Sequence, residues 1–144
     1  MRFFGLLFIL VLSLSASSEV AKTLGYYDDY DTALSVAKQA HKPLMLVVVT
    51  SYCPWCRKLE RKSLASQKVA AKIKANFIPV IVDRNKDAKY FPSKFQTPRI
   101  PTVFYIDPDD GNKYWETIGY LSKRDFLEAL EDAEAIYKKQ PFSD

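Results

Sequence analysis

The chain has 144 residues, 48% of them hydrophobic and 26% charged, which fits one soluble globular domain with its own apolar core. The formal net charge is only +4, and basic residues alternate with acidic ones along the chain. Because nucleic-acid binding usually requires a clustered basic stripe, we interpret these charges as a solvated surface and expect no nucleic-acid partner.

Residues 1–18 have the layout of a secretory signal peptide. Arg2 supplies a positive charge, the stretch 3–14 is almost wholly apolar, and small residues follow it. A signal peptide has an apolar segment of about 7–15 residues, whereas a membrane span needs about 20. We therefore expect export, cleavage near Ala16 to Ser18, and a mature domain over 19–144. An uncleaved membrane anchor is the alternative.

The first predicted elements of the domain are a helix and a strand. Apolar residues at helical spacing predict a helix over 31–39, which Asp31 caps and the segment His41–Pro43 ends. The apolar run Leu44–Val49 then stops at the polar Thr50. Such a run predicts a strand that is buried on both faces, which is typical of a central parallel strand.

The only two cysteines follow this strand, in the order Cys53-Pro54-Trp55-Cys56. A bridge across so short a loop would constrain the unfolded chain little. One cysteine pair and the lone His41 cannot supply the four ligands of structural zinc. We therefore interpret the pair as a redox couple and expect no metal and no cofactor, with inert or metal-binding cysteines as the alternatives. Pro54 suits the first turn of a helix, which would begin beside the pair at the carboxyl end of a central strand.

The remaining predicted elements complete a layered fold. We expect a helix over 67–75 capped by Ser66 and then a strand over 77–82 ending at Asp83. A connection over 84–100 follows, with a short helix near 88–91. The last elements are a strand over 102–106, a turn over 108–112, a strand over 113–119 and a helix capped by Ser122. Parallel units come first and an antiparallel hairpin comes last. This order predicts an α/β fold, with a central mixed sheet of four to five strands flanked by helices on both faces.

Three motifs in this order resemble the thioredoxin superfamily over about residues 26–139. They are the segment TSYCPWC after a buried strand, Ile100-Pro101-Thr102 at the place of the family's cis-proline loop, and the hairpin VFYIDPDDGN with Gly119 beyond it. The pattern from Tyr52 to Glu60 is similar to that of exported thioredoxin-like proteins of the SoxW type and of the DsbD C-terminal domain. The chain departs from cytosolic thioredoxin, which has a buried Asp where Val47 stands.

The resemblance implies a thioredoxin fold and thiol–disulfide exchange by Cys53 and Cys56. A helix N-terminus favours an anion, so the pKa of Cys53 should lie below the ordinary thiol value of about 8.5. Cys56, shielded by the helix, would attack the mixed disulfide and release the substrate. Because Val47 replaces the buried Asp, Glu60 is our candidate for taking the proton from Cys56. An exposed carboxylate in a run of charges is the alternative interpretation of Glu60.

Four further residues are predicted to contact the substrate. Ile100 and Pro101 form the expected cis-proline loop, along which an extended substrate backbone could pair as an added strand. Tyr52 and Trp55 would form an apolar rim around the cysteines. Partial packing inside the protein is the alternative for both aromatic residues.

Three functions remain open from the sequence. The SoxW and DsbD resemblance favours an exported reductase of protein disulfides, which receives electrons from a membrane or periplasmic redox donor. Pro54 favours instead an oxidant similar to DsbA, and a non-catalytic binding or chaperone module is the third alternative. The expected partners are disulfide-containing proteins and the donor, and we expect a monomer. The final residues QPFSD carry no ER-retention signal, which favours the bacterial periplasm.

Overall fold

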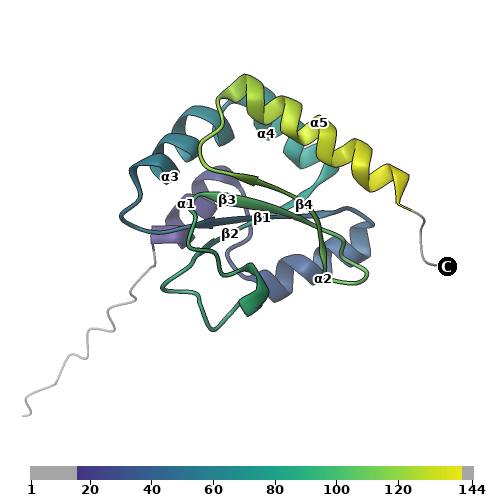
Figure 1. Ribbon diagram of the computed structural model, residues 1–144, viewed down its shortest axis with the longest axis horizontal. Helices are drawn as coiled ribbons and strands as arrows, with labels where there is room; N and C mark the ends of the chain where they lie inside the picture. Colours follow the sequence, from purple (N-terminus) through teal and green to yellow (C-terminus); the bar gives the residue numbers. More distant parts are fainter. Residues whose placement is uncertain (1–15, 141–144) are drawn as a thin grey trace, which may run out of the picture.

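Four strands form one mixed sheet at the centre of the protein (Figure 1). The computed structural model describes residues 16–140, in which the strands are β1 (Leu44–Val49), β2 (Ile78–Asp83), β3 (Thr102–Ile106) and β4 (Lys113–Ile118). Their order across the sheet is β2-β1-β3-β4. β1 is parallel to β2 and antiparallel to β3, and β3 is antiparallel to β4. The predicted fold, a mixed sheet with helices on both faces, is confirmed.

The central strand β1 separates two apolar cores. All six of its residues are buried, as the sequence predicted. Met45, Val47 and Val49 belong to one core, and the residues between them belong to the other. Side chains of a strand alternate between its faces, so a strand that is apolar on both faces requires cover on both sides.

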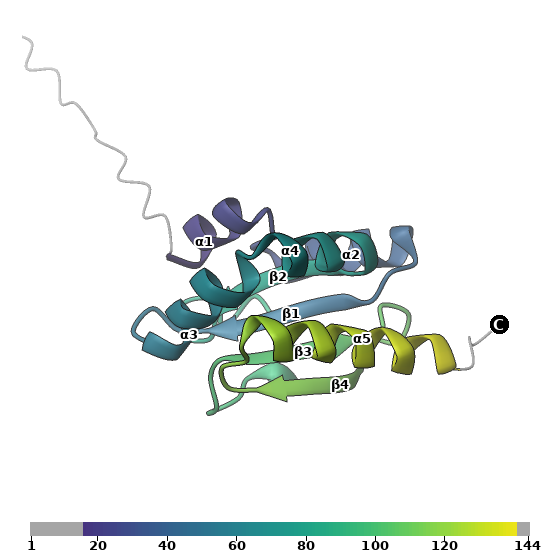
Figure 2. The same cartoon turned by 90° about the horizontal axis from the view of Figure 1, so that it is seen from above.

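Helices provide this cover. On the face that carries Val47 lie α1 (Ala16–Leu24), α3 (Pro54–Lys58), the π-helix η1 (Leu59–Leu64), α4 (Gln67–Asn76) and α5 (Lys123–Lys139). On the opposite face lie α2 (Tyr30–Ala40) and the 3-10 turn η2 (Ser93–Phe95). Viewed from above, α4 lies near β2, whereas α5 lies near β4 (Figure 2). No helix between residues 16 and 140 has both the length and the apolar character that a membrane span requires.

Two details of the predicted elements are wrong. The N-cap of α2 is Asp29, not Asp31, because the Asp29 side chain accepts a hydrogen bond from the Thr32 N–H at 2.8 Å. The short helix expected near 88–91 is instead the turn η2, which follows Pro92. Pro92 has no N–H to donate, but its carbonyl accepts a hydrogen bond from the Phe95 N–H at 3.0 Å, so it suits this position.

The helix α1 is an element that the sequence did not predict. Its residue Ala21 is buried in the same core as Cys56. After α1 ends, the Tyr27 N–H donates to the Pro79 carbonyl of β2 at 3.0 Å. The chain from Ala21 onward is therefore packed into the domain. The apolar run 3–14 lies outside the described residues, so the signal peptide and its boundary stay predictions.

Candidate active site

The two cysteines form a disulfide at the start of α3. Cys53 is the N-cap of this helix, and its Sγ accepts a hydrogen bond from the Cys56 N–H at 3.1 Å. Pro54 occupies the first turn, where a missing N–H costs no hydrogen bond. Cys53 retains 8% of its surface exposed, whereas Cys56 is fully buried. An incoming group therefore reaches the sulfur of Cys53 before that of Cys56.

The start of α3 also favours negative charge on Cys53 once the disulfide is reduced. The Cys56 N–H already points at the sulfur, and η1 continues the helix beyond Lys58. Unpaired N–H groups and the helix dipole both stabilise an anion at this end of a helix. The thiolate is the form that attacks a disulfide, so this geometry prepares Cys53 for exchange.

Asp83 fixes the turn that leads into the cysteines. It lies at the carboxyl end of β2 with 2% of its surface exposed, and it accepts a hydrogen bond from the Ser51 hydroxyl at 2.8 Å. The backbone N–H groups of Asn85 and Lys86 donate to its other oxygen. Burial opposes ionisation, but these hydrogen bonds outweigh it, and the pKa of Asp83 lies below its usual value. The carboxylate therefore stays charged and holds Ser51, two residues before Cys53.

Glu60 lies one turn beyond Cys56, with only 5% of its surface exposed. The alternative interpretation, an exposed carboxylate, is wrong. Its Oε1 faces Arg57 Nη2 at 3.0 Å, but this ion pair lacks hydrogen-bond alignment, and no other donor in the described part of the chain reaches that oxygen. Burial raises the pKa of Glu60, an effect that the charges of Arg57 and Arg61 only partly offset.

Arg57 links Glu60 to the end of β1. Its Nη2 donates to the carbonyl of Thr50 at 3.1 Å while it faces Glu60. A cavity of about 280 Å³ separates these side chains from α1, where Thr23 and Leu24 form part of its wall. The unpredicted helix α1 therefore lies over Glu60 and contributes to its burial.

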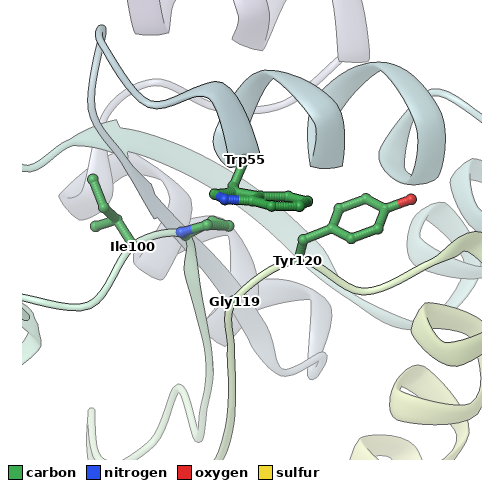
Figure 3. Close-up of a pocket in the computed structure, with 5 residues that line it drawn as sticks. Trp55, Ile100, Gly119 and Tyr120 are labelled. Carbon is green, nitrogen blue, oxygen red and sulfur yellow. The ribbon is translucent and has the colours of Figure 1, made fainter.

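A groove beside the disulfide collects residues from three segments of the chain (Figure 3). It has a volume of about 370 Å³ and is lined by Trp55, Ile100, Pro101, Gly119 and Tyr120. The Ile100–Pro101 peptide bond is cis. The rings of Trp55 and Tyr120 lie 5.8 Å apart between centroids, and 56% of the Trp55 surface is exposed. The groove is open and partly aromatic, and Trp55 on its wall lies between the two cysteines in the chain.

The structure brings together three of the four predicted contact residues. Trp55, Ile100 and Pro101 share the groove, but Tyr52 does not line it and is 98% exposed. A substrate contact of Tyr52 stays a prediction.

Sequence reasoning missed Gly119 and Tyr120 as lining residues of the groove. Gly119 adopts a φ of 87°, and its N–H donates to the carbonyl of Pro101 at 2.7 Å. Glycine adopts such a φ without strain, and the turn it makes ties the two loops of the groove together. The sequence signal was present, because this glycine follows directly after the hairpin.

The described residues contain no group of three or more His, Cys, Asp or Glu side chains that could hold a metal ion.

The sequence model of the thioredoxin-like domain family matches residues 30–134. Similar solved structures include a thioredoxin from Thermus thermophilus, with a TM-score of 0.66, 20% identity, and coverage of 74% of this chain and 85% of that one. A disulphide isomerase from Xylella fastidiosa has a TM-score of 0.60 and 24% identity, covering 85% of this chain and 97% of its own. The oxidised DsbD C-terminal domain of Neisseria meningitidis has a TM-score of 0.58 and 18% identity, covering 75% and 98%. Identities this low establish the fold alone.

Curated relatives match a shorter part of the chain. Spermatogenesis-associated protein 20 of Rattus norvegicus is 35% identical over 54 residues, and that of Mus musculus is 37% identical over 54 residues. These segments cover 38% of this chain but only 7% of either relative, so the chain spans a small fraction of their length. The family match, in contrast, contains both cysteines and the cis Ile100–Pro101 bond. This chain therefore belongs to the thioredoxin-like domain family, and its Cys53–Cys56 disulfide fits the redox role of a disulfide oxidoreductase.

Proposed function

We propose that the protein is an exported thiol–disulfide oxidoreductase that reduces disulfides in partner proteins. The observation that carries this proposal is the asymmetry of the cysteine pair beside an open groove. Cys53 is accessible at a helix N-terminus, and Cys56 is fully buried behind it. A partner can reach the sulfur of Cys53, while the sulfur of Cys56 is held close enough to bond to it.

The reaction proceeds in two exchanges. The Cys53 thiolate of the reduced protein attacks one sulfur of the partner disulfide, a Cys53–partner bond forms, and the other partner sulfur leaves as a thiolate. Cys56 then loses its proton and attacks the Cys53 sulfur. The Cys53–Cys56 bond forms, the mixed disulfide breaks, and the second partner thiolate leaves. The partner gains two electrons, and a membrane or periplasmic dithiol donor returns the pair to its reduced state.

Glu60 is the proposed acceptor of the Cys56 proton. It lies one turn away on the same buried side of the helix, and one of its oxygens lacks an aligned hydrogen bond. Burial raises its pKa, and a base whose pKa lies nearer to neutrality takes up a proton more readily than an ordinary carboxylate does. Arg57 positions this carboxylate through its contact with Thr50.

Of the electrostatic effects near the pair, one opposes the direction of reduction and one supports it. The helix N-terminus stabilises the Cys53 thiolate, which would make the pair more oxidising, as in DsbA. The buried carboxylate of Glu60 acts in the opposite sense, since a negative charge nearby disfavours a second one. The positive charge of Arg57 is already engaged by Glu60 at 3.0 Å, so it adds little to the stability of the thiolate.

A second candidate function is the oxidant, which would introduce disulfides into partners. The hydrogen bond from the Cys56 N–H to the Cys53 sulfur favours it, because that donor remains available to the thiolate. If this effect exceeds that of Glu60, the reduced form of the pair is stabilised. The Cys53–Cys56 disulfide then oxidises the thiols of the partner.

Turnover of a protein disulfide tests the proposal. With dithiothreitol as the donor, the protein should accelerate the reduction of insulin, and Cys53→Ser and Cys56→Ser should both lose this activity. After reduction and removal of dithiothreitol, Cys56→Ser mixed with insulin should also accumulate a covalent complex, whereas Cys53→Ser should not. A wild-type protein that neither accelerates reduction nor forms the complex would support the non-catalytic binding module instead.

Location requires a separate experiment. The proposal of export to a bacterial periplasm is supported by the apolar leader pattern and by the bacterial DsbD domain among the similar structures. The full chain produced in a bacterial host should appear in the periplasmic fraction, shortened by about the length of the leader. Retention of the full-length chain in the membrane would favour the uncleaved anchor, and retention in the cytoplasm would contradict export.

A further inference from the structure

A positive charge without a carboxylate partner borders the groove beside the disulfide. The Lys58 ammonium lies 4.9 Å from the ring centroid of Trp55 and 4.6 Å from that of Tyr120. Between residues 16 and 140, none of the ion pairs involves Lys58. The aromatic faces hold the ammonium in place, but they carry no net charge. Its full positive charge is therefore presented at the edge of the groove.

Other cations continue this positive border. Arg99 immediately precedes the cis-proline loop and is exposed. The Ser63 hydroxyl donates to the Leu121 carbonyl at 2.6 Å, which places η1 against the loop that leads into α5. The exposed residues Lys62 and Lys123 flank this contact in the sequence. Arg99, Lys62 and Lys123 make no ion pair within the described part of the chain.

Nearby carboxylates do not neutralise these charges, because each has other partners. Glu60 is buried against Arg57, and Asp83 is buried and accepts from Ser51. Asp125, at the start of α5, accepts from the Ser122 hydroxyl and faces Arg124 at 3.3 Å. A partner segment lying in the groove therefore meets a surface of one sign.

We infer that the preferred partners present their reactive cysteine in an extended acidic segment, which is recognised at the Trp55–Lys58–Tyr120 corner of the groove. This inference rests on the proposed function and adds the chemical class of the partner. Residues on one side of the partner cysteine lie near Lys58, and those on the other side lie near Arg99. At an exposed rim each charge pair should give about a twofold to fivefold preference, expressed mainly in the rate of association.

Three peptides of identical length test the inference. Each carries one cysteine in a disulfide with a small fluorogenic thiol, and the residues on both sides of the cysteine are Asp, Ser or Lys. At low ionic strength, the reduced full chain should react fastest with the Asp peptide and slowest with the Lys peptide, with about a tenfold ratio between them. In 0.5 M salt this ratio should fall towards one, because exposed charges are then screened.

Lys58→Glu should lower the Asp-over-Lys ratio by at least about threefold, and Lys58→Gln should have an intermediate effect. Lys38→Glu is the matched control, because it makes the same change of net charge near the end of α2. That end precedes the first residue of β1, whereas the cysteines follow its last residue. A change in the intrinsic reactivity of Cys53 alters the rates with both peptides equally and leaves their ratio unchanged. The ratio therefore separates an effect of Lys58 on recognition from an effect on the reactivity of Cys53.

The Ser peptide distinguishes failure of the inference from failure of the proposed function. Suppose that the protein reduces the Ser peptide, but the Asp-over-Lys rate ratio is near one, persists in 0.5 M salt, or is unchanged in Lys58→Glu. Any of these three results overturns the inference, and the proposed function stands. If the wild-type protein reduces none of the peptides faster than Cys53→Ser does, both the inference and the proposed function are overturned. If Lys58→Glu lowers the rate of reduction of oxidised glutathione but not that of the peptides, the groove favours a small anionic disulfide, and the inference is also overturned.

Discussion

Asp83, which holds Ser51 ahead of Cys53, and Glu60, one turn beyond Cys56, are both buried carboxylates, and their environments move their pKa values in opposite directions. Asp83 has 2% of its surface exposed and accepts hydrogen bonds from one hydroxyl and two backbone N–H groups. Glu60 is 5% exposed and has one ion pair without hydrogen-bond alignment. The pKa of Asp83 is lowered and that of Glu60 is raised.

The comparison shows that the number of aligned donors, more than burial, decides which role a buried carboxylate can take. A carboxylate with several donors stays ionised and serves as a fixed anion. A carboxylate that lacks such donors loses fewer hydrogen bonds when it accepts a proton, which suits proton transfer in an active site. Asp83 should therefore matter most for stability, and Glu60 for the rate of exchange.

The largest expected effect is kinetic, and it comes from Glu60→Gln. If Glu60 takes the proton from Cys56, the second exchange should slow by about a hundredfold, since positioned bases typically contribute at least that much. Rapid mixing of the reduced protein with a small disulfide, followed by quenching and mass spectrometry, measures how fast the mixed disulfide decays.

Glu128→Gln provides the control, because this exposed glutamate lies on α5 and touches neither cysteine. Its decay rate should equal that of the wild type. An unchanged rate in Glu60→Gln would remove Glu60 from the reaction.

The next effect is on stability, and it comes from Asp83→Asn. The amide has one acceptor oxygen in place of two, so it cannot accept all three hydrogen bonds, and the free energy of unfolding should fall by about 2 kcal/mol. Urea denaturation measures this difference. Asp29→Asn is the matched control, since Asn caps a helix about as well as Asp does, and it should change stability little. Equal stability of the two variants would contradict the role given to Asp83.

The smallest effect is the pH dependence of stability, in which the two carboxylates act with opposite sign. The raised pKa of Glu60 means that the folded state binds its proton more tightly than the unfolded state. Stability should therefore fall as pH rises from about 4.3, the ordinary Glu value, through the raised pKa. The lowered pKa of Asp83 gives stability that is present above about 3.9 and is lost as pH falls through the folded-state value.

Urea titrations at a series of pH values should separate these contributions. Glu60→Gln should remove the loss of stability above about pH 4.3, and Asp83→Asn should weaken the loss at lower pH. If Glu60→Gln retains the wild-type slope, another group is responsible for it.

Much of the fold and the cysteine geometry could be predicted because the signals are local. The apolar run Leu44–Val49 identifies the central strand, and Pro54 identifies the start of the helix that Cys53 caps. The burial of Glu60 was also readable from the sequence. Cys56, Leu59, Glu60, Ser63 and Leu64 recur at helical spacing and are all buried, so Glu60 lies on the inward face.

The remaining features depend on contacts between distant segments. α1 lies over the Glu60 cavity, yet its own sequence is short and follows directly after the apolar leader. The π-helical form of η1 depends on how its buried face packs, which residue propensity does not encode. The stacking of Tyr120 on Trp55 likewise joins residues far apart in the chain.

Whether the Cys53–Cys56 pair is a reducing dithiol can be measured through its equilibrium with glutathione. The fraction of protein in the dithiol form, measured by thiol alkylation across a series of glutathione ratios, gives the reduction potential. For a reducing dithiol we expect a potential near that of thioredoxin, about −270 mV, and a shift to a less negative value in Glu60→Gln. A wild-type potential near that of DsbA, about −120 mV, would contradict the reductase and establish the oxidant.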